Sequence, residues 1–244
     1  MYKYREIFYK QYYTNQAGKA DPSLFKNTFE EQKWNFTNEI VCHFPKNKDL
    51  RILDIGSGIG SLIQAAKDAG YKNIRGIDIS TEQVETALKL GVKEVEEGNL
   101  DKIFENNEDK YDIICGMDII EHFSKDELVD ILIKLKNKLN NSGMLIFRTP
   151  NSDAPLSSVF AKGDFTHECH LNKSSALQLM KSCGFSDVEV LPSMLKLRNP
   201  IKELLRKFLW FGVNFCLKII LFSTARTWHQ VLFTPNLIII SVKQ

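Results

Sequence analysis

Short apolar runs alternate with segments of helical periodicity from Leu50 onward. The apolar runs predict buried strands, and apolar positions three or four residues apart predict helices. The predicted strands cover residues 51–55, 74–79, 111–115, 144–147, 188–191 and 237–242. The predicted helices cover residues 61–69, 81–90, 125–139 and 174–182. Strands that alternate with helices predict an α/β fold, in which a mainly parallel sheet is covered by helices on both faces.

The segment before this alternation, residues 1–45, is rich in aromatic side chains. The spacing from Phe29 to Phe36 predicts a helix, with Thr28 as its N-cap and Pro45 beyond its end. We expect most of these aromatic side chains to pad the outside of the main domain. Residues 1–45 are therefore interpreted as a cap region within a single domain of residues 1–244.

An additional segment, residues 192–235, separates the last two predicted strands. It contains a helical run from Ile201 to Phe222 that starts with basic residues and becomes apolar almost all round. A spanning helix needs about 20 consecutive apolar residues, and Asn214 and Lys218 interrupt this run. We therefore expect a helix that lies at a membrane interface, or one that packs on the domain, covers the acceptor site or forms a homodimer contact.

Composition narrows the class of protein further. The net charge of +2 is too small to indicate a nucleic-acid partner. Five cysteines without a CxxC pair predict neither a disulfide framework nor a structural zinc site, and they fit a reducing cytoplasm. The N-terminal residues contain no continuous apolar run, so no secretory signal is expected there.

A glycine loop joins the first predicted strand to the first predicted helix. Gly56 permits a tight turn, Gly58 lets the backbone approach a ligand, and the helix beyond offers unpaired N–H groups. Asp54, at the end of the strand, suits a cationic amino-acid group better than a pyrophosphate, and no P-loop lysine follows. Asp78 ends the second strand, about 20 residues after the loop, where a carboxylate can accept hydrogen bonds from both hydroxyls of a ribose.

These motifs resemble those of the class I S-adenosylmethionine-dependent methyltransferases, which have a Rossmann-like fold. The resemblance covers about residues 50–190, and it is nearest to the ubiquinone-biosynthesis O-methyltransferases and to methyltransferases of bacterial surface-polysaccharide clusters. It implies that S-adenosyl-L-methionine is the cofactor and that residues 54–60 hold its methionine part. It also implies that Asp78 binds the ribose and that Ile79 packs on the adenine. The residues implied in cofactor binding are Asp54, Gly56, Ser57, Gly58, Gly60, Asp78, Ile79, Asn99, Leu100 and Met117.

Two histidines are candidates for the base that removes a proton from the methyl acceptor. His167 lies in a loop after the strand predicted at residues 144–147, where Asp164 and Glu168 could orient its ring. His122 follows the strand predicted at residues 111–115, and the resemblance places it near the cofactor. We rank His167 first, although it could instead hydrogen-bond a backbone carbonyl and fix its loop. The run from His167 to His170 lacks the spacing of a metal site, so no metal is expected there.

The expected reaction is O-methylation of a sugar hydroxyl in a cell-surface glycan or in its lipid-linked or nucleotide-linked precursor. One alternative acceptor is a quinone or another lipid-like small molecule, and a different class of protein is a non-catalytic partner that binds the cofactor. The expected location is the cytoplasm or the inner face of the membrane, with the membrane contact made by residues 201–222.

Overall fold

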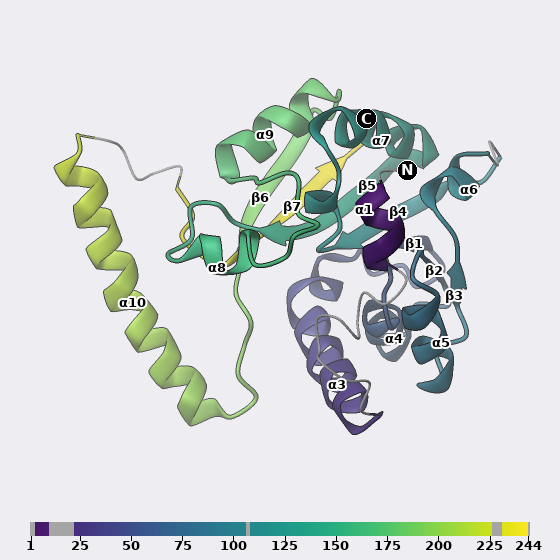
Figure 1. Ribbon diagram of the computed structural model, residues 1–244, viewed down its shortest axis with the longest axis horizontal. Helices are drawn as coiled ribbons and strands as arrows, with labels where there is room; N and C mark the ends of the chain where they lie inside the picture. The colour runs from purple at the N-terminus through teal and green to yellow at the C-terminus, as the bar shows by residue number, and fades with distance from the viewer. Residues whose placement is uncertain (1–2, 10–21, 106–107, 226–230, 244) are drawn as a thin grey trace.

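The computed structural model describes residues 3–9, 22–105, 108–225 and 231–243 (Figure 1). Its strands are β1 (Arg51–Ile55), β2 (Asn73–Asp78), β3 (Val95–Glu97), β4 (Tyr111–Met117), β5 (Leu139–Pro150), β6 (Asp187–Ser193) and β7 (Asn236–Val242). Its helices are α1 (Lys3–Phe8), α3 (Pro22–Glu39), η2 (Val41–His43), α4 (Ser61–Asp68), α5 (Thr81–Lys89), α6 (Leu100–Glu105), η3 (Ile120–His122), α7 (Lys125–Lys138), α8 (Ser157–Ala161), α9 (Lys173–Ser182) and α10 (Pro200–Ser223).

The seven strands form one sheet in the order β3-β2-β1-β4-β5-β7-β6. The first five pair in parallel, whereas β7 runs antiparallel to both of its neighbours, β5 and β6. The prediction of a mainly parallel, Rossmann-like sheet is thus confirmed. Because β1, β2 and β4 end at one edge of the sheet, their C-terminal residues come together there, where α/β proteins bind ligands.

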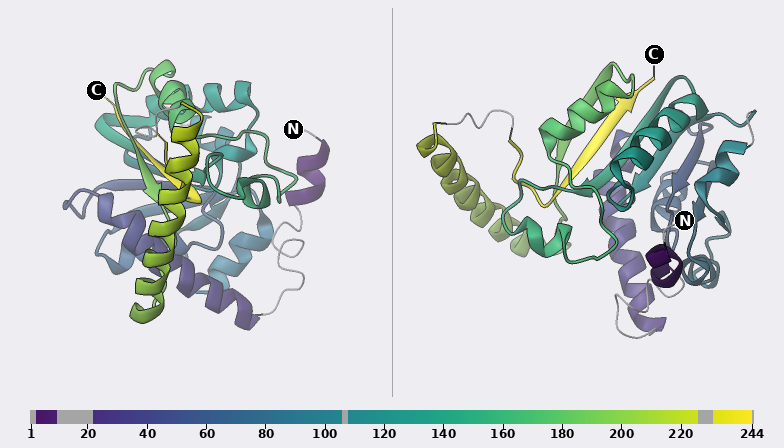
Figure 2. Two further views of the ribbon diagram at one scale, coloured as in Figure 1. Left: turned by 90° about the vertical axis from the view of Figure 1, so that its left-hand side faces the viewer. Right: turned by 45° about the horizontal axis from the view of Figure 1, so that its top comes forward.

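Helices cover both faces of this sheet (Figure 2). On one face, α3, α4 and α5 pack against side chains such as Ile52, Ile113 and Ile146. On the other face, α6, α7 and α9 pack against side chains such as Ile114 and Leu145. Central strands such as β1 and β4 therefore send alternate side chains into two separate cores, which is why their sequences are largely apolar.

Helix starts follow the caps that the sequence offers. The Ser80 side chain accepts a hydrogen bond from Gln83 N at the start of α5, as expected for an N-cap. Ser124 and Glu127 form a reciprocal capping box at the start of α7. The prediction for Thr28 is wrong, because α3 begins six residues earlier, at Pro22, and Thr28 lies within the helix.

Two of the N-terminal aromatic residues differ from the expectation for this segment. Phe29 and Phe36 are buried in the core that α3 shares with α4, rather than padding the outside of the domain. Trp34 keeps 40% of its surface exposed. Tyr12 and Tyr13 belong to the same aromatic segment but lie outside the described residues. The helix α3 is thus an integral layer of the fold, and its buried face reaches the edge where the strands end.

The helix α10 differs from all of these layers. It begins at Pro200, is capped by the Asn199 side chain, runs for 24 residues and contains no buried residue. Figures 1 and 2 show it standing apart from the sheet and its covering helices. Among the helices that the structure describes, none combines the length and the apolar character needed to cross a membrane.

Candidate active site

A cavity of about 670 Å³ lies at the edge where β1, β2 and β4 end. Its lining comes from the loop after β1, the ends of β2 and β4, and the helices α3 and α7, together with two residues near the N-terminus. Nine of the ten residues implied in cofactor binding line it: Asp54, Gly56, Ser57, Gly58, Asp78, Ile79, Asn99, Leu100 and Met117. Gly60 is the tenth, and it serves as the N-cap of α4 instead.

The loop after β1 needs its glycines for two reasons. Gly56 and Gly58 both have a positive φ, of 64° and 54°, which side chains with a Cβ disfavour. A Cβ on Gly58 would also lie 2.7 Å from Gln83 Oε1, and one on Gly56 would lie 2.6 Å from Ile119 Cδ1. The neighbouring side chains thus leave no room for a Cβ at Gly56 or Gly58, and the loop backbone itself lines the cavity.

Asp54 is the least solvated charged group of the cavity. Its side chain is 1% exposed, and Oδ1 has no hydrogen-bond partner among the described residues. Burial, and to a lesser extent the charge of Asp78, hold the pKa of this carboxyl well above its usual range. An unpartnered carboxylate oxygen in a cavity wall is costly unless a donor or a cation binds there. The site is therefore matched to a positively charged group.

Asp78 lies at the end of the neighbouring strand and is fixed by backbone donors. Its Oδ2 accepts a hydrogen bond from Gly58 N at 2.7 Å, and its Oδ1 accepts one from Ser80 N at 2.8 Å. Burial raises the pKa of Asp78, and these two hydrogen bonds oppose that rise. Each oxygen still has a second lone pair, so the carboxylate can accept hydrogen bonds from a ligand without moving.

Asn99 lines the same cavity near the start of α6. Its Nδ2 donates to Asp101 Oδ2 at 3.0 Å, and its Oδ1 accepts from Lys102 N at 3.3 Å. The amide oxygen therefore already has one partner and keeps one lone pair for a ligand. Ile79 and Leu100 also line the cavity and offer apolar surface beside this amide.

His122 lines the cavity at the end of η3 and is buried. Its Nδ1 lies 2.8 Å from Thr166 Oγ1, which in turn donates to Asp164 Oδ1 at 2.7 Å. An ionised carboxylate only accepts hydrogen bonds, so the hydroxyl proton of Thr166 points to Asp164 and His122 Nδ1–H donates to the hydroxyl. The ring then carries its lone pair on Nε2. Burial and the neighbouring His167 lower the pKa of His122 to about 4.

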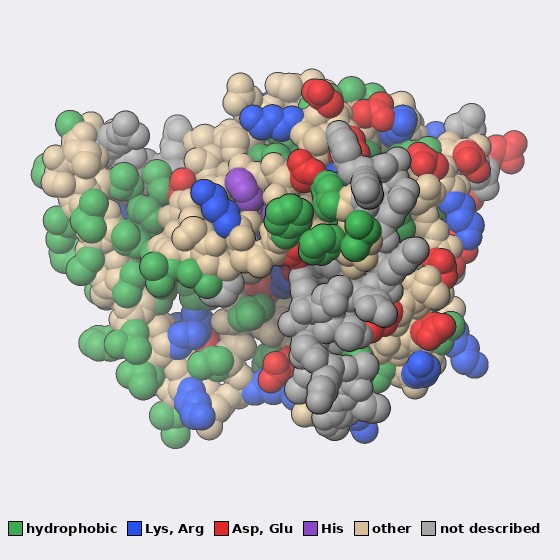
Figure 3. Space-filling model, in the orientation of Figure 1, with side chains coloured by type: hydrophobic (Ala, Val, Ile, Leu, Met, Phe, Trp, Pro, Cys, Tyr) green, Lys and Arg blue, Asp and Glu red, His purple; other side chains and the backbone are tan. Residues whose placement is uncertain are grey.

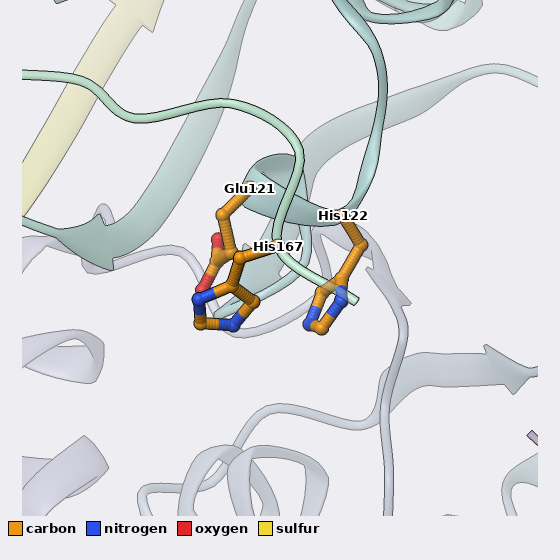
Figure 4. A group of neighbouring side chains, drawn as sticks. All are labelled: Glu121, His122 and His167. Carbon is orange, nitrogen blue, oxygen red and sulfur yellow. The ribbon is translucent and has the colours of Figure 1, made fainter. Parts of the chain in front are cut away.

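His167 stands behind His122 and does not belong to the lining of the cavity. The two rings meet edge to face, with centroids 4.7 Å apart (Figure 4). His167 Nδ1 donates to the carbonyl oxygen of Ala161 at 2.9 Å, which is the loop-fixing bond that the sequence left as the alternative. The Glu168 carboxylate does not orient this ring as expected, because it accepts a hydrogen bond from the Tyr4 hydroxyl.

Glu121 belongs to the same cluster, with its carboxylate beside the His167 ring (Figure 4). Its Oε2 accepts from Thr149 Oγ1 at 3.0 Å, while Oε1 is buried without a partner among the described residues. Burial holds its pKa well above the usual range. Glu121, His122 and His167 each place one possible ligand atom within 4.8 Å of the others. These three side chains, rather than the run from His167 to His170, are thus the group that could hold a metal ion.

Several residues of the cavity were not found from the sequence. Arg5 of α1 reaches across the fold to donate to Glu127 at 2.7 Å and 2.8 Å and to the His122 carbonyl at 2.7 Å. Gln32 and Phe36 of α3 also line the cavity. Arg148, a charged residue within the apolar strand β5, pairs with Asp118, whose φ is 53°. A buried charge in an apolar strand was the only one of these features that the sequence could have shown.

Comparison with known proteins agrees with this geometry. A family model described as a methyltransferase domain matches residues 31–190. A ribosomal protein L11 methyltransferase of Lactobacillus gasseri is 33% identical over 103 residues, which are 41% of this chain. The chain matches only 31% of that relative's length.

Solved structures with low sequence identity share the fold. An S-adenosylmethionine-dependent methyltransferase from Archaeoglobus fulgidus has a TM-score of 0.66 and 19% identity, and the match covers 90% of this chain and 98% of that one. The phosphoethanolamine N-methyltransferase 2 of Haemonchus contortus, solved with S-adenosyl-L-methionine, has a TM-score of 0.62 and 18% identity over 100% of this chain and 60% of that one.

The family match includes the glycine loop, Asp54, Asp78 and His122. These are residues that carried the resemblance in the sequence. The chain therefore belongs to the methyltransferase domain family.

Proposed function

We propose that the protein transfers a methyl group from S-adenosylmethionine to a sugar hydroxyl of a cell-surface glycan or of its lipid-linked or nucleotide-linked precursor. The observation that carries this proposal is His122, a neutral imidazole in the lining of the cavity that also contains Asp54 and Asp78. A hydroxyl must lose its proton to become an ether, and the unprotonated ring nitrogen of His122 offers a lone pair that can accept it.

The residues that would hold the cofactor follow from the chemistry of the lining. Asp54 and the backbone of residues 56–58 are assigned to the charged methionine end, because Asp54 Oδ1 needs a cationic or donor partner. Asp78 is assigned to the ribose hydroxyls, with Asn99 and Ile79 beside the adenine and Met117 beside the methionine end. When bound, the cofactor supplies a methyl group that its sulfonium has already activated.

The protein's own part in the reaction is to orient the acceptor and to take its proton. We assign the proton to Nε2 of His122, since Nδ1 is occupied by the bond to Thr166. Asp164, acting through Thr166, keeps the ring in this tautomer and stabilises the positive charge that protonation creates. His167 is assigned a positioning role, because it touches the His122 ring but not the cavity.

The proposal includes where the enzyme acts in the cell. We place it at the inner face of a membrane, in contact through residues 201–222, because α10 contains no buried residue. The same helix favours a second acceptor class, a quinone or another lipid-like molecule, which would also be reached at a membrane.

The test is transfer of labelled methyl from S-adenosylmethionine to three sets of acceptors: nucleotide sugars, glycan extracts and lipid extracts. Label in a glycan or its precursor, with mass spectrometry locating an added methyl ether, supports the proposal. Label found only in quinones or other lipids would show that the acceptor is a lipid-like molecule and not a sugar. Absence of transfer to all three sets, with the cofactor bound in calorimetry, rejects O-methylation of these acceptors.

A further inference from the structure

The polar and apolar sides of α10 are arranged in the reverse of the usual order for a surface helix. Its half-buried residues are Glu203, Arg206, Trp210, Asn214, Leu217 and Leu221. They follow each other at intervals of three and four, so they form one stripe. At the start of this stripe, Glu203 accepts a hydrogen bond from Leu197 N and Arg206 contacts Met194 Sδ. Half of this stripe is polar, although an ordinary surface helix turns its apolar side to the domain.

The outward side of α10, by contrast, is predominantly apolar. Phe208 and Phe211 are 72% and 73% exposed, and Figure 3 shows hydrophobic side chains spread over this part of the surface. The other large apolar side chains exposed on α10 are Ile201, Leu204, Leu205, Leu209, Val213, Phe215, Ile219, Ile220 and Phe222. A continuous apolar surface of this length marks a binding face, because water alone solvates it poorly.

The charges on α10 identify what binds there. Three lysines, Lys202, Lys207 and Lys218, are exposed around the apolar surface. The only acid of the helix, Glu203, is half-buried and bonds to Arg206 at 2.6 Å and 2.7 Å. The exposed charge of the helix is therefore positive, which complements a surface of anionic lipid headgroups.

A second copy of the chain fits the same surface less well. A two-fold contact along α10 would place equal patches against each other. Because its exposed charges are all lysines, and its one acid, Glu203, already pairs with Arg206 and Lys207 of the same helix, such a contact would bring like charges together without further acids to pair with them. An anionic bilayer accepts the apolar side chains and the lysines at the same time.

The sheet register connects this helix to the acceptor site. Ser193, which ends β6, pairs with Asn236, which begins β7, and Asn236 also pairs with Pro150 at the end of β5. The chain thus leaves for α10 and returns from it at the same sheet edge that carries His122 and the cavity. A bilayer bound to α10 lies on the acceptor side of the protein.

We propose that the outward face of α10 binds the surface of an anionic membrane and that the methyl acceptor is therefore lipid-linked. The membrane part stands on the helix alone, whereas the choice of a lipid-linked acceptor rests on the proposed function. The helix would lie in the plane of the interface, where about 36 Å of its length can bury apolar side chains while the lysines reach the headgroups.

The first experiment measures sedimentation of the full chain with vesicles of phosphatidylcholine alone or with 30% phosphatidylglycerol (about one anionic lipid in three, as a probe). We expect binding that is stronger on the anionic vesicles and weaker in high salt. The triple change Lys202→Glu, Lys207→Glu and Lys218→Glu should weaken anionic binding at least ~100-fold, at about fivefold or more for each lysine. The triple change Phe208→Ser, Phe211→Ser and Phe215→Ser should abolish binding to both vesicles.

The matched control reverses three exposed lysines, Lys72, Lys89 and Lys93, which belong to or adjoin α5 and β2, elements that Figure 1 shows at the other end of the sheet from α10. It alters the net charge equally and should leave vesicle binding unchanged. Equal loss in the control, or a wild-type chain that stays in the supernatant at low salt, overturns the membrane part. If the protein does not bind vesicles but forms dimers through α10 in light scattering, the membrane part is also overturned, and α10 is a self-association surface.

The acceptor part is tested separately by methyl transfer. We expect transfer to lipid-linked glycan presented in anionic vesicles, and we expect the lysine triple variant to lose it while still binding the cofactor in calorimetry. Transfer only to water-soluble nucleotide sugars overturns the lipid-linked acceptor and leaves both vesicle binding and sugar methylation standing. Vesicle binding without transfer to any sugar overturns the proposed function instead.

Discussion

The cavity edge and α10 each hold side chains in surroundings that do not suit them. At the cavity, the carboxyl groups of Asp54 and Asp78 are buried, and Asp54 Oδ1 has no hydrogen-bond partner among the described residues. On α10, large apolar groups such as Phe208 and Phe211 are exposed, and nothing within the described chain covers them. Each region is thus incomplete by itself: the first lacks a cationic ligand for Asp54, and the second lacks an apolar environment.

This contrast shows how a binding region can be recognised from its energetics. Burying a carboxylate and exposing a row of phenylalanines are both unfavourable in the isolated chain. A fold keeps such features where a ligand or a surface offsets the cost. The following substitutions test whether the two regions carry separate functions.

The largest expected effect is on turnover, at the cavity. His122→Ala removes the group assigned to the acceptor proton, so turnover should fall by about 10²–10⁴-fold while cofactor affinity stays near normal. Steady-state kinetics and calorimetry measure the two quantities. The control is His170→Ala, an exposed histidine of the loop that carries His167, which should keep normal turnover. If His167→Ala abolishes turnover and His122→Ala does not, the assignment of the base is wrong.

A pair of leucines compares the two regions in stability. Leu62 is 1% exposed in the core beneath the glycine loop, and Leu204 is 70% exposed on α10. Leu62→Ala should lower the free energy of unfolding by about 2–5 kcal/mol, because it leaves a cavity in a packed core. Leu204→Ala should change it by less than about 0.5 kcal/mol. Urea unfolding without lipid measures both, and a large loss for Leu204→Ala would show that α10 packs on the domain in solution.

Cofactor affinity should respond to the ribose carboxylate. Asp78→Ala removes two or more hydrogen bonds to a charged acceptor, so binding of S-adenosylmethionine should weaken by about 1–3 kcal/mol. The variant also releases the Gly58 and Ser80 N–H groups that Asp78 holds. Asp78→Asn, which keeps the size and one acceptor oxygen, should lose less. Calorimetry that shows unchanged affinity for both variants would remove Asp78 from the cofactor site.

The smallest effect concerns the ion pair that holds α1 on the cavity. Arg5 lowers the pKa of Glu127 to about 2, below the value of about 4.3 for an unfolded chain. This stabilisation is therefore fully present above pH 4.3 and is lost as the pH falls through 2. Glu127→Gln should cost about 1 kcal/mol or less at pH 7, and the difference from wild type should shrink at pH 3. Urea titrations at both values measure it, and a difference independent of pH would exclude the ion pair as its cause.

Much of the fold could be predicted because its strands are buried on both faces. Continuous apolar runs and the glycines that follow the helices give the strand positions directly. The strand β3 was missed because its residues, Val95–Glu97, contain a single apolar side chain. The beginning of β5 was missed because Asn140 and Ser142 interrupt it, although Tyr111 pairs with Leu139 there.

The site was predictable where one local motif carries it, and less so where distant segments meet. Asp54, Asp78 and the glycines lie within 25 residues of one another, so their spacing alone placed them at one sheet edge. The contact of Arg5 with Glu127 spans 122 positions and left no pattern in the sequence. The ranking of His122 and His167 as candidate bases depends on which ring reaches the cavity. That is decided by how the loop of residues 161–167 folds beside η3, which the sequence does not show.

The placement of β7 between β5 and β6 has a consequence for biosynthesis. This strand follows α10 in the chain, so the gap in the sheet cannot close until α10 has been synthesised. The parallel strands and the helices that cover them precede it and can pack first, since domains fold as their segments emerge. The apolar helix is thus available to a bilayer, or to a chaperone, before the last strand enters the sheet, and membrane attachment can come before the completion of the fold.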